Sequence, residues 1–453
     1  MNKVIAYIGI FLSLLTIYSC GEDRTYEYEE KTQHNQWMLE VMLDQYLWAD
    51  TLASYEPTWK SFFAKPSEFL STLTSKTGQS DSWSYVEVDT IASDSHERGY
   101  FNHINTYGYD FKLMTDPTGQ TTKSVLRVLT VYPGSPAEQA GLKRNDYICS
   151  YDSYKITSNN VSKLQKGVAR SLEVRHLEVD DEGVFYWSDT TTLSMSASTY
   201  VEDDAFPVSS ILDVEGVRVG YLMCTRLLAY PEEKGTGRTS DTTYRDKLDQ
   251  IMQKMKQSGV TEFVLDLRLC NYGTLDMAQR LASYVVAPQY LGETFVKTYR
   301  NENHTSENIT LSYDTSLGNL GLSRLYIITG SYTQGAPEWL IHSLQHTMGE
   351  ENVYLLGEAT QGQNVMTEEV GYQYDVHLYP VVAYVADGNG DYDDGSITPT
   401  ETLKELEYLY LGGYGTVNEI LLYTAIQRIL GIGQDVSENE EESDNSAEEE
   451  AVE

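Results

Sequence analysis

The segment from residue 329 to residue 346 holds side chains whose types and spacing could support catalysis. Hydroxyl groups on Ser331, Thr333 and Ser343 lie close in sequence to His342 and His346. A hydroxyl becomes an effective nucleophile only when a neighbouring base accepts its proton, and histidine is the most frequent such base. The two histidines are four residues apart, so they share one face of a helix, where such pairs are more often surface or packing residues. The segment permits nucleophilic catalysis without indicating it.

An acidic segment, DGNGDYDDG at residues 387–395, has the alternating oxygen-bearing side chains of a calcium-binding loop. The EF-hand pattern requires Gly at its sixth position and Glu at its twelfth. Tyr392 and Thr398 occupy those positions here. A solvated loop is therefore favoured over a calcium site, which stays the alternative.

The cysteines and histidines do not indicate a metal or redox site. Besides Cys20 there are three cysteines, Cys149, Cys224 and Cys270, which are far apart in sequence and mostly within apolar runs. They are interpreted as buried small hydrophobic residues. The 8 histidines form no zinc-type cluster with cysteine or acidic partners. We expect neither a metal nor a cofactor.

The elements that would position the chemical groups form an alternating pattern after about Val208. Apolar runs predict strands at residues 217–222, 263–267, 325–329 and 353–357. Between them, helical spacing marks one face made by Tyr244, Leu248, Ile251, Met252 and Met255, and another made by Met277, Leu281, Ala282 and Val285. Alternation of strands and helices implies crossover connections and a largely parallel sheet.

Two different patterns precede this region. Aromatic and aliphatic residues recur at helical spacing from Trp37 to Trp48, and Pro66 fits the first turn of another helix, which predicts a small helical domain. From about Gly99 the pattern changes to short strands with turns. Gly141 is expected to end a short helix that starts near Ser135. Asn145 follows at a turn that needs a positive φ.

The segments TYGYDFKL (106–113) and PGSPAEQAGLKRNDYI (133–148) resemble a PDZ domain of the permuted bacterial type. The resemblance implies that a loop turns its backbone N–H groups inward to hold a C-terminal carboxylate, while the bound peptide adds a strand to the sheet edge. The loop would consist of Tyr107, Gly108, Tyr109, Asp110 and Phe111. The Asp110 carboxylate argues mildly against carboxylate capture because like charges repel. A PDZ domain kept as a structural spacer is the alternative.

Three further segments, VLDLRLCNYG (264–273), TGSYTQGAPEWLI (329–341) and LLGEATQGQNV (355–365), resemble in order and spacing the core of the C-terminal-processing (tail-specific) serine protease family. The family pattern has a VLDLR strand followed by Asn and glycines, a T-A-S-A-S-E turn into a helix, and a strand ending in G-x-x-T-x-G-K. The first Ser of S-A-S-E is the family's nucleophile and the final Lys is its base. Such a lysine needs a pKa lowered by burial, and the glycines help to stabilise the oxyanion.

This chain departs from the family pattern at each chemical position. Gly335 stands at the nucleophile position, and Gln363 stands at the base position, where it cannot accept a proton near neutral pH. In the oxyanion-loop region, Asn271 and Tyr272 replace family residues and only Gly273 survives. The resemblance therefore implies a protein without catalytic activity that binds peptides or protein C-termini. A working peptidase with a rewired nucleophile and a protein-interaction scaffold are the alternatives.

The N-terminus resembles a bacterial lipoprotein signal. Lys3 precedes an apolar run at residues 4–18, which is too short to span a bilayer, and Cys20 follows it. We expect lipid chains on Cys20 to anchor the protein at the outer membrane of a bacterial cell envelope, with its periplasmic or surface orientation left open. The formal net charge of −36 argues against a nucleic-acid partner, because phosphates would be repelled.

We therefore predict an α/β fold with added domains: an N-terminal helical domain, a PDZ-like β domain and a ClpP/crotonase-like α/β protease domain. The predicted division is a signal peptide at 1–19, a tether at 20–36, the helical domain at 37–95, the PDZ domain at 99–200, the protease-like domain at 208–433 and an acidic disordered tail at 434–453.

Overall fold

The structure is a computed structural model that describes residues 25–78, 81–88, 105–180, 184–202, 204–231, 241–392 and 395–432. The predicted signal peptide, Cys20 and the predicted acidic tail lie outside these residues. The chain forms two compact units. The first unit comprises Met1–Ser93, Arg300–Glu307 and Val365–Ala383, and the second comprises Asp94–Tyr299, Asn308–Asn364 and Tyr384–Glu453. The first unit thus recruits two segments that the sequence assigned to the protease-like domain.

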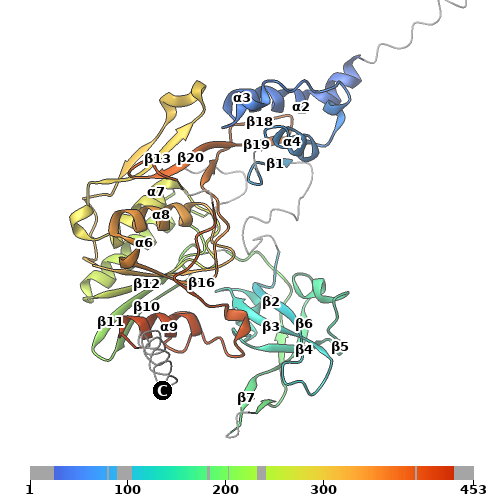
Figure 1. Cartoon of the computed structure of the whole chain (residues 1–453). Helices are drawn as coiled ribbons and strands as arrows, with labels where there is room; N and C mark the ends of the chain where they lie inside the picture. The colour runs from blue at the N-terminus through green and yellow to red at the C-terminus, as the bar shows by residue number, and fades with distance from the viewer. Residues whose placement is uncertain are drawn as a thin grey trace, which may run out of the picture. The chain divides into compact units, whose positions relative to one another are not determined.

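The first unit combines helices with a small sheet (Figure 1). Its elements are α2 (Thr25–Gln45), α3 (Ala49–Leu52), η1 (Ser61–Phe63), α4 (Pro66–Thr74), η4 (Glu302–Glu307), β17 (Val365–Thr367) and the antiparallel strands β1 (Tyr85–Val88), β19 (Val376–Tyr379) and β18 (Gly371–Gln373). Met38, Met42 and Leu73 are fully buried, and Pro66 begins α4 as expected. α2 begins at Thr25, so residues 25–36 are helical where a tether was predicted. Among the described residues, no helix has both the length and the apolarity to cross a membrane.

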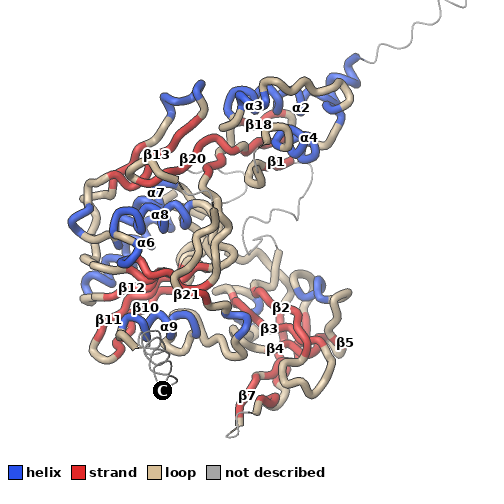
Figure 2. The backbone as a smooth tube through the Cα atoms, in the orientation of Figure 1, coloured by secondary structure: helices blue, strands red, loops and turns tan. Residues whose placement is uncertain are grey.

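The second unit begins with a β domain that contains a six-stranded sheet and a separate hairpin (Figure 2). Its elements are β2 (Tyr109–Thr115), β3 (Ser124–Val131), α5 (Pro136–Gln139), β4 (Tyr147–Tyr151), β5 (Tyr154–Lys155), η2 (Val161–Leu164), β6 (Arg170–Arg175), β7 (Leu177–Val179), β8 (Phe185–Trp187) and β9 (Thr191–Met195). The order β2-β3-β4-β6-β9 places β2 at an edge. The Ser135 side chain caps α5, and Asn145 has φ +72°, which confirms the prediction of a positive φ there.

The rest of the second unit is a twisted α/β sheet with strand order β10-β11-β12-β15-β16-β21. The strands are β10 (Val208–Val214), β11 (Val217–Met223), β12 (Glu262–Asp266), β15 (Leu325–Thr329), β16 (Val353–Gly357) and β21 (Glu401–Thr402), and the main helices are α6 (Thr243–Gln257), α7 (Leu275–Val285), α8 (Ala336–Met348) and α9 (Ile420–Ile429). All neighbouring pairs from β11 to β21 are parallel, as predicted, and only β10 pairs antiparallel.

Helices cover both faces of this sheet. α6, α7 and α8 lie on one side and α9 on the other (Figure 1). The predicted α6 face is buried at Tyr244, Leu248, Met252 and Met255. Smaller elements complete the α/β region: η3 (Pro288–Tyr290), β13 (Thr294–Arg300), β14 (Thr310–Ser312), η5 (Glu350–Asn352), β20 (Val381–Asp387) and η6 (Glu405–Glu407).

Candidate functional site

The three segments that carry the family resemblance meet at the carboxyl edge of the parallel sheet. β12 ends at Asp266, β15 at Thr329 and β16 at Gly357, and these strands are direct neighbours. Loops that leave the carboxyl ends of adjacent parallel strands form the usual ligand site of such sheets. The backbone N–H of Gln334 donates to the Cys270 carbonyl over 3.1 Å, which joins the loop after β12 to the turn after β15.

Gly335 and Gln363, the positions implied as nucleophile and base, lie side by side. Gly335 precedes α8 with φ +73° and ψ −118°, a conformation that L side chains rarely adopt. A Cβ atom at Gly335 would lie 3.3 Å from Oε1 of Gln363. The fold thus brings the two positions together, and neither carries the hydroxyl or the amine that the resemblance implies there.

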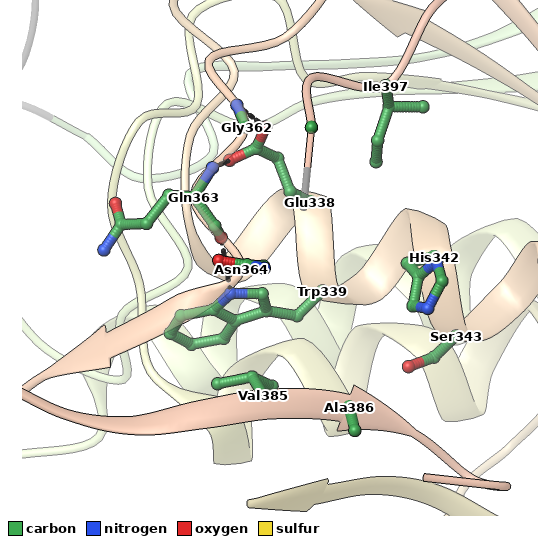
Figure 3. Close-up of a pocket in the computed structure, with 11 residues that line it drawn as sticks. Glu338, Trp339, His342, Ser343, Gly362, Gln363, Asn364, Val385, Ala386 and Ile397 are labelled. Carbon is green, nitrogen blue, oxygen red and sulfur yellow. Dashed lines mark hydrogen bonds between the residues drawn. The ribbon is translucent and has the colours of Figure 1, made fainter. Parts of the chain in front are cut away.

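Glu338 holds these two positions together. Its buried carboxylate accepts hydrogen bonds from the backbone N–H groups of Gly335 (2.8 Å), Gly362 (2.5 Å) and Gln363 (2.9 Å), as Figure 3 shows for the last two. Burial raises the pKa of Glu338, although the hydrogen bonds from Thr360 and these backbone groups act in the opposite direction. Because its oxygens are occupied by backbone donors, Glu338 serves as a positioning residue.

Gln363 accepts hydrogen bonds from two neutral side chains. Its Oε1 accepts a hydrogen bond from Nε2 of Gln334 over 2.8 Å. Its backbone carbonyl accepts another from Nε1 of Trp339, also over 2.8 Å (Figure 3). A carboxamide has no proton-accepting group near neutral pH. This arrangement can hold a ligand through hydrogen bonds but cannot activate a hydroxyl.

The predicted oxyanion-loop residues Asn271, Tyr272 and Gly273 are all half-buried beside the same turn. The Tyr272 carbonyl accepts a hydrogen bond from the N–H of Leu227 over 2.9 Å. A Cβ at Gly273 would lie 2.5 Å from Cβ of Leu227 and 2.9 Å from Cβ of Ala336. Close packing is therefore sufficient reason for glycine at position 273.

The neighbouring hydroxyls form no substitute nucleophile–base pair. Thr333 is fully buried, and its hydroxyl donates to the Leu267 carbonyl over 2.9 Å and accepts the Gly330 N–H over 2.9 Å. Ser331 is exposed, whereas Ser343 is buried and its Oγ has no hydrogen-bond partner among the described residues. Within the part of the chain that the structure describes, no hydrogen bond joins any of these hydroxyls to a histidine or lysine.

The two histidines of α8 face the acidic segment instead. Nε2 of His342 lies 3.2 Å from the Asp391 carbonyl oxygen, and Nδ1 of His346 lies 2.9 Å from Oδ2 of Asp387. The other carboxylate oxygen of Asp387 accepts backbone N–H groups of Asn389, Gly390 and Asp391 over 2.8 to 3.0 Å. Across the described residues, which omit 393–394, no group of three His, Cys, Asp or Glu side chains is placed to hold a metal ion.

A buried charged cluster behind the site was not predicted. Arg268, at 4% exposure, donates to both carboxylate oxygens of Asp266 over 3.0 and 2.7 Å and to both of Glu419 over 2.7 and 3.0 Å. It also reaches Glu405 over 2.6 Å. Arg144 of the β domain donates to Glu405 over 2.9 Å and to Glu419 over 3.3 Å. Arg268, the last residue of the LDLR segment, is therefore a structural residue that ties the loop after β12 to distant parts of the chain.

The five residues of the predicted carboxylate loop lie at the start of the edge strand β2. Tyr107 and Tyr109 are buried in the core of the β domain. Gly108 has φ +76°, and a Cβ there would lie 2.2 Å from Cβ of Ser135. The half-buried Asp110 accepts a hydrogen bond from the Tyr132 hydroxyl over 2.8 Å. Phe111, which is also half-buried, stacks at a tilt against Tyr109.

Two of the backbone donors in this loop are already used within the domain. The Tyr107 N–H donates to the Gln165 carbonyl over 3.1 Å, and the Gly108 N–H donates to Oγ1 of Thr106 over 3.1 Å. A carboxylate would have to compete with both acceptors. The loop therefore offers fewer free N–H groups for carboxylate capture than the resemblance implies.

Comparisons with known proteins bear on the fold and on family membership. The model of peptidase family S41 matches residues 218–403, and the model of the peptidase S41 N-terminal domain matches residues 33–85. A crystal structure of a Bacteroides fragilis protein, described as a candidate S41 protease, matches with a TM-score of 0.76 and 28% identity, covering 87% of this chain and 97% of that one.

A second solved structure, that of a photosystem II D1 C-terminal processing protease, matches more weakly. It has a TM-score of 0.45 and 17% identity over 84% of this chain and 96% of that one. A search of curated proteins finds no match. The range matched by the S41 model contains all three segments that meet at the sheet edge. The chain belongs to peptidase family S41, the family of the C-terminal-processing, or tail-specific, proteases.

Proposed function

We propose that this member of family S41 is a non-catalytic protein of the bacterial cell envelope that binds peptides or the C-termini of proteins. The observation that carries the proposal is the adjacency of Gly335 and Gln363, whose Cβ position and Oε1 atom lie 3.3 Å apart. Loss of one member of a nucleophile–base pair typically lowers the rate by about 10⁴ to 10⁶. Here neither position carries a group that can attack a carbonyl or accept a proton.

Peptide binding is supported by two features that do not require catalysis. The first is the site beside Gly335, where the amide groups of Gln334 and Gln363 and the backbone of the turn after β15 supply hydrogen-bonding groups. The second is β2, which pairs only with β3 within the described sheet and so presents an edge to which a peptide strand can add. We include in this proposal that the β domain is a PDZ-like domain.

Attachment through lipid on Cys20 belongs to the same proposal and rests on the sequence alone. It would keep the binding sites at a membrane surface, with the side of that membrane undetermined. Partners in this setting are peptides or protein termini, since a formal charge of −36 disfavours nucleic acid.

Purified full chain should be tested for catalysis and for binding in the same preparation. We expect no labelling by a fluorophosphonate probe, no cleavage of casein or of tailed peptides, and measurable binding in a peptide library screen. Proteolysis that persists through repurification would contradict the inactive assignment and would direct attention to Ser331, Thr333 and Ser343. Absence of any peptide binding would contradict the binding function.

A further inference from the structure

Three exposed aromatic side chains form one continuous surface on the first unit. Tyr28 of α2 is 54% exposed, Trp59 is 66% exposed and Phe63 of η1 is 38% exposed. The Phe63 ring contacts both others edge to face, with its centroid 5.9 Å from that of Tyr28 and 5.8 Å from that of Trp59. Single exposed hydrophobic residues need no explanation, whereas a contiguous group of large rings commonly marks a binding surface. We call these three residues the aromatic patch.

The main chain beneath the patch is fixed by a buried side chain of α2. Asn35 is fully buried, and its Nδ2 donates to the carbonyls of Phe62 over 3.0 Å and Ala64 over 2.8 Å, on either side of Phe63. The Phe62 ring contacts buried Phe69, with the two centroids 5.5 Å apart. Because these contacts fix the segment before any ligand arrives, binding at the patch costs little ordering entropy.

The proposed lipid attachment point is a short distance along the chain from the patch. Cys20 is five residues before Thr25, where α2 begins, and Tyr28 lies in the first turn of α2. Five residues span at most about 18 Å when fully extended, and the helix adds about 5 Å between Thr25 and Tyr28. A lipid on Cys20 inserted in a bilayer would therefore keep Tyr28 within about 25 Å of the membrane surface, at a high local concentration.

We propose that the aromatic patch lies in the interfacial region of the phospholipid bilayer that holds the lipid of Cys20. The inference rests on the proposed lipid attachment and adds a second contact between the protein and the membrane. Tryptophan and tyrosine are favoured at that depth, because their rings are apolar while the indole N–H and the phenol O–H stay near water and headgroups. Exposed Lys60, whose Nζ lies 5.7 Å from the centroid of the Trp59 ring, can approach a lipid phosphate.

A second copy of the chain is a less suitable occupant of the patch. The three side chains together expose roughly 350 Å², whereas a stable protein interface buries about 800 Å² on each partner. Membrane contact does not require that area, since the lipid on Cys20 already holds the protein at the surface. The patch alone is too small to replace the lipid, so Cys20→Ser should still leave the membrane.

The test uses the lipidated full chain in phosphatidylcholine vesicles, with or without bromine on the acyl chains close to the headgroup. Bromine quenches only tryptophan that reaches the acyl region, and Trp59 is one of 6 tryptophans in the chain. We expect brominated vesicles to quench a minor component of the emission and Trp59→Phe to lose most of that quenching. Trp187→Phe is the control, because it removes a half-buried tryptophan from β8 of the second unit and should leave the quenched component unchanged.

A second pair of variants tests the patch itself with Trp59 left in place. Tyr28→Ser removes a ring of the patch and should weaken the quenching of Trp59, because less apolar surface enters the interface. Tyr154→Ser is the matched control, since Tyr154 is 64% exposed in β5 of the β domain and lies outside the patch. Both tyrosines are largely exposed, so we expect thermal unfolding of the two variants to match that of the unmodified protein.

The outcomes separate the inference from the anchor on which it rests, because uptake of labelled fatty acid at Cys20 is measured in the same preparation. A labelled protein without quenching, or with quenching that survives in Trp59→Phe, overturns the inference and leaves the anchor intact. A dimer in detergent solution that Tyr28→Ser dissociates assigns the patch to a second copy of the chain, which also overturns it. If Cys20 carries no label, the proposed attachment fails and the inference fails with it.

Discussion

At the scale of single residues, hydrogen bonds to Glu338 hold the turn at Gly335 in place although the nucleophile and base of the family pattern are absent from the sequence. Gly335 has φ +73° and ψ −118°, where a side chain would be strained by about 1–3 kcal/mol. A glycine removes that strain while Glu338 still holds the turn against Gly362 and Gln363. The proposed absence of catalysis thus comes from two missing side chains in a turn that is otherwise held in place.

Restoring both missing side chains tests this view. In Gly335→Ser with Gln363→Lys, the Cβ atom of the new serine would lie 3.3 Å from the present position of the Gln363 Oε1, so we expect slow but measurable fluorophosphonate labelling. Pro337 is no obstacle, since it lies in the first turn of α8, where proline is well accommodated. Adding Tyr272→Gly should raise the labelling rate by about tenfold or more if its bulk hinders an oxyanion.

The matched control is Gly335→Ala with Gln363→Lys, which has the lysine and the backbone strain but no hydroxyl. It should remain unlabelled. Labelling of the unmodified chain at the rate of the restored variant would show that another nucleophile operates.

At the scale of elements, the charged cluster of Asp266, Arg268, Glu405, Glu419 and Arg144 fixes the end of β12. Glu419 also caps α9 by accepting the N–H groups of Leu421 and Leu422. One carboxylate thus joins a strand end, a helix start and the β domain through Arg144. Breaking a buried pair of this kind on one side typically costs about 3–5 kcal/mol, because the remaining charge is left without a partner.

The cluster makes the free energy of unfolding depend on pH. Burial alone would raise the pKa of Glu405, but Arg144 and Arg268 outweigh it and lower the pKa from 4.5 to about 2. Ionised Glu405 therefore contributes about 3 kcal/mol to the free energy of unfolding above pH 4.5. This contribution is lost as the pH falls towards 2. In urea titrations, Glu405→Gln should be less stable at pH 7 and should lose less stability on acidification than the unmodified protein.

The control for this experiment is Glu407→Gln. That side chain is 71% exposed and forms a weak surface pair with Lys404 at 3.8 Å. The stability of Glu407→Gln should depend on pH in the same way as that of the unmodified chain. If Glu405→Gln behaves in the same way, the cluster does not carry the acid sensitivity.

The edge strand β2 gives a second prediction at this scale. Because the N–H groups of Tyr107 and Gly108 are bonded to Gln165 and Thr106, a peptide with a free C-terminus should bind within about threefold of its amidated form. Thr106→Val removes the acceptor of the Gly108 N–H and should increase the preference for the free acid. A loss of binding beyond tenfold on amidation in the unmodified protein would establish carboxylate capture after all.

At the scale of the whole molecule, the sequence predicts the features that are determined by local residue patterns. Apolar runs separated by helical periods predict the parallel strands, and the turn at Asn145 predicts its positive φ. The partners of Arg268 leave no local signal, since Glu405 and Glu419 are 137 and 151 residues away. The first turns of α2 are polar and lack an apolar period, so a helix beginning at Thr25 was not predicted.

The candidate site, too, was predicted only where local patterns determine it. The positions of Gly335 and Gln363 come from matching ordered segments to a family pattern, and the fold then brings them together. The aromatic patch was missed because its rings come from α2 and from the segment around η1, which are close only in three dimensions. The internal use of the Tyr107 donor was missed for the same reason, since Gln165 approaches from a distant turn.

The remaining prediction concerns where the whole molecule resides. Lys3, the apolar run at 4–18 and Cys20 together predict that the unmodified protein partitions into the detergent phase and takes up labelled fatty acid. Cys20→Ser should abolish the label and move the protein to the aqueous phase, because the rest of a chain with a formal charge of −36 is strongly polar. Cys149→Ser, which changes a half-buried thiol in β4, should leave both properties intact. Unchanged partition in Cys20→Ser would show that some other part of the molecule holds it to the membrane.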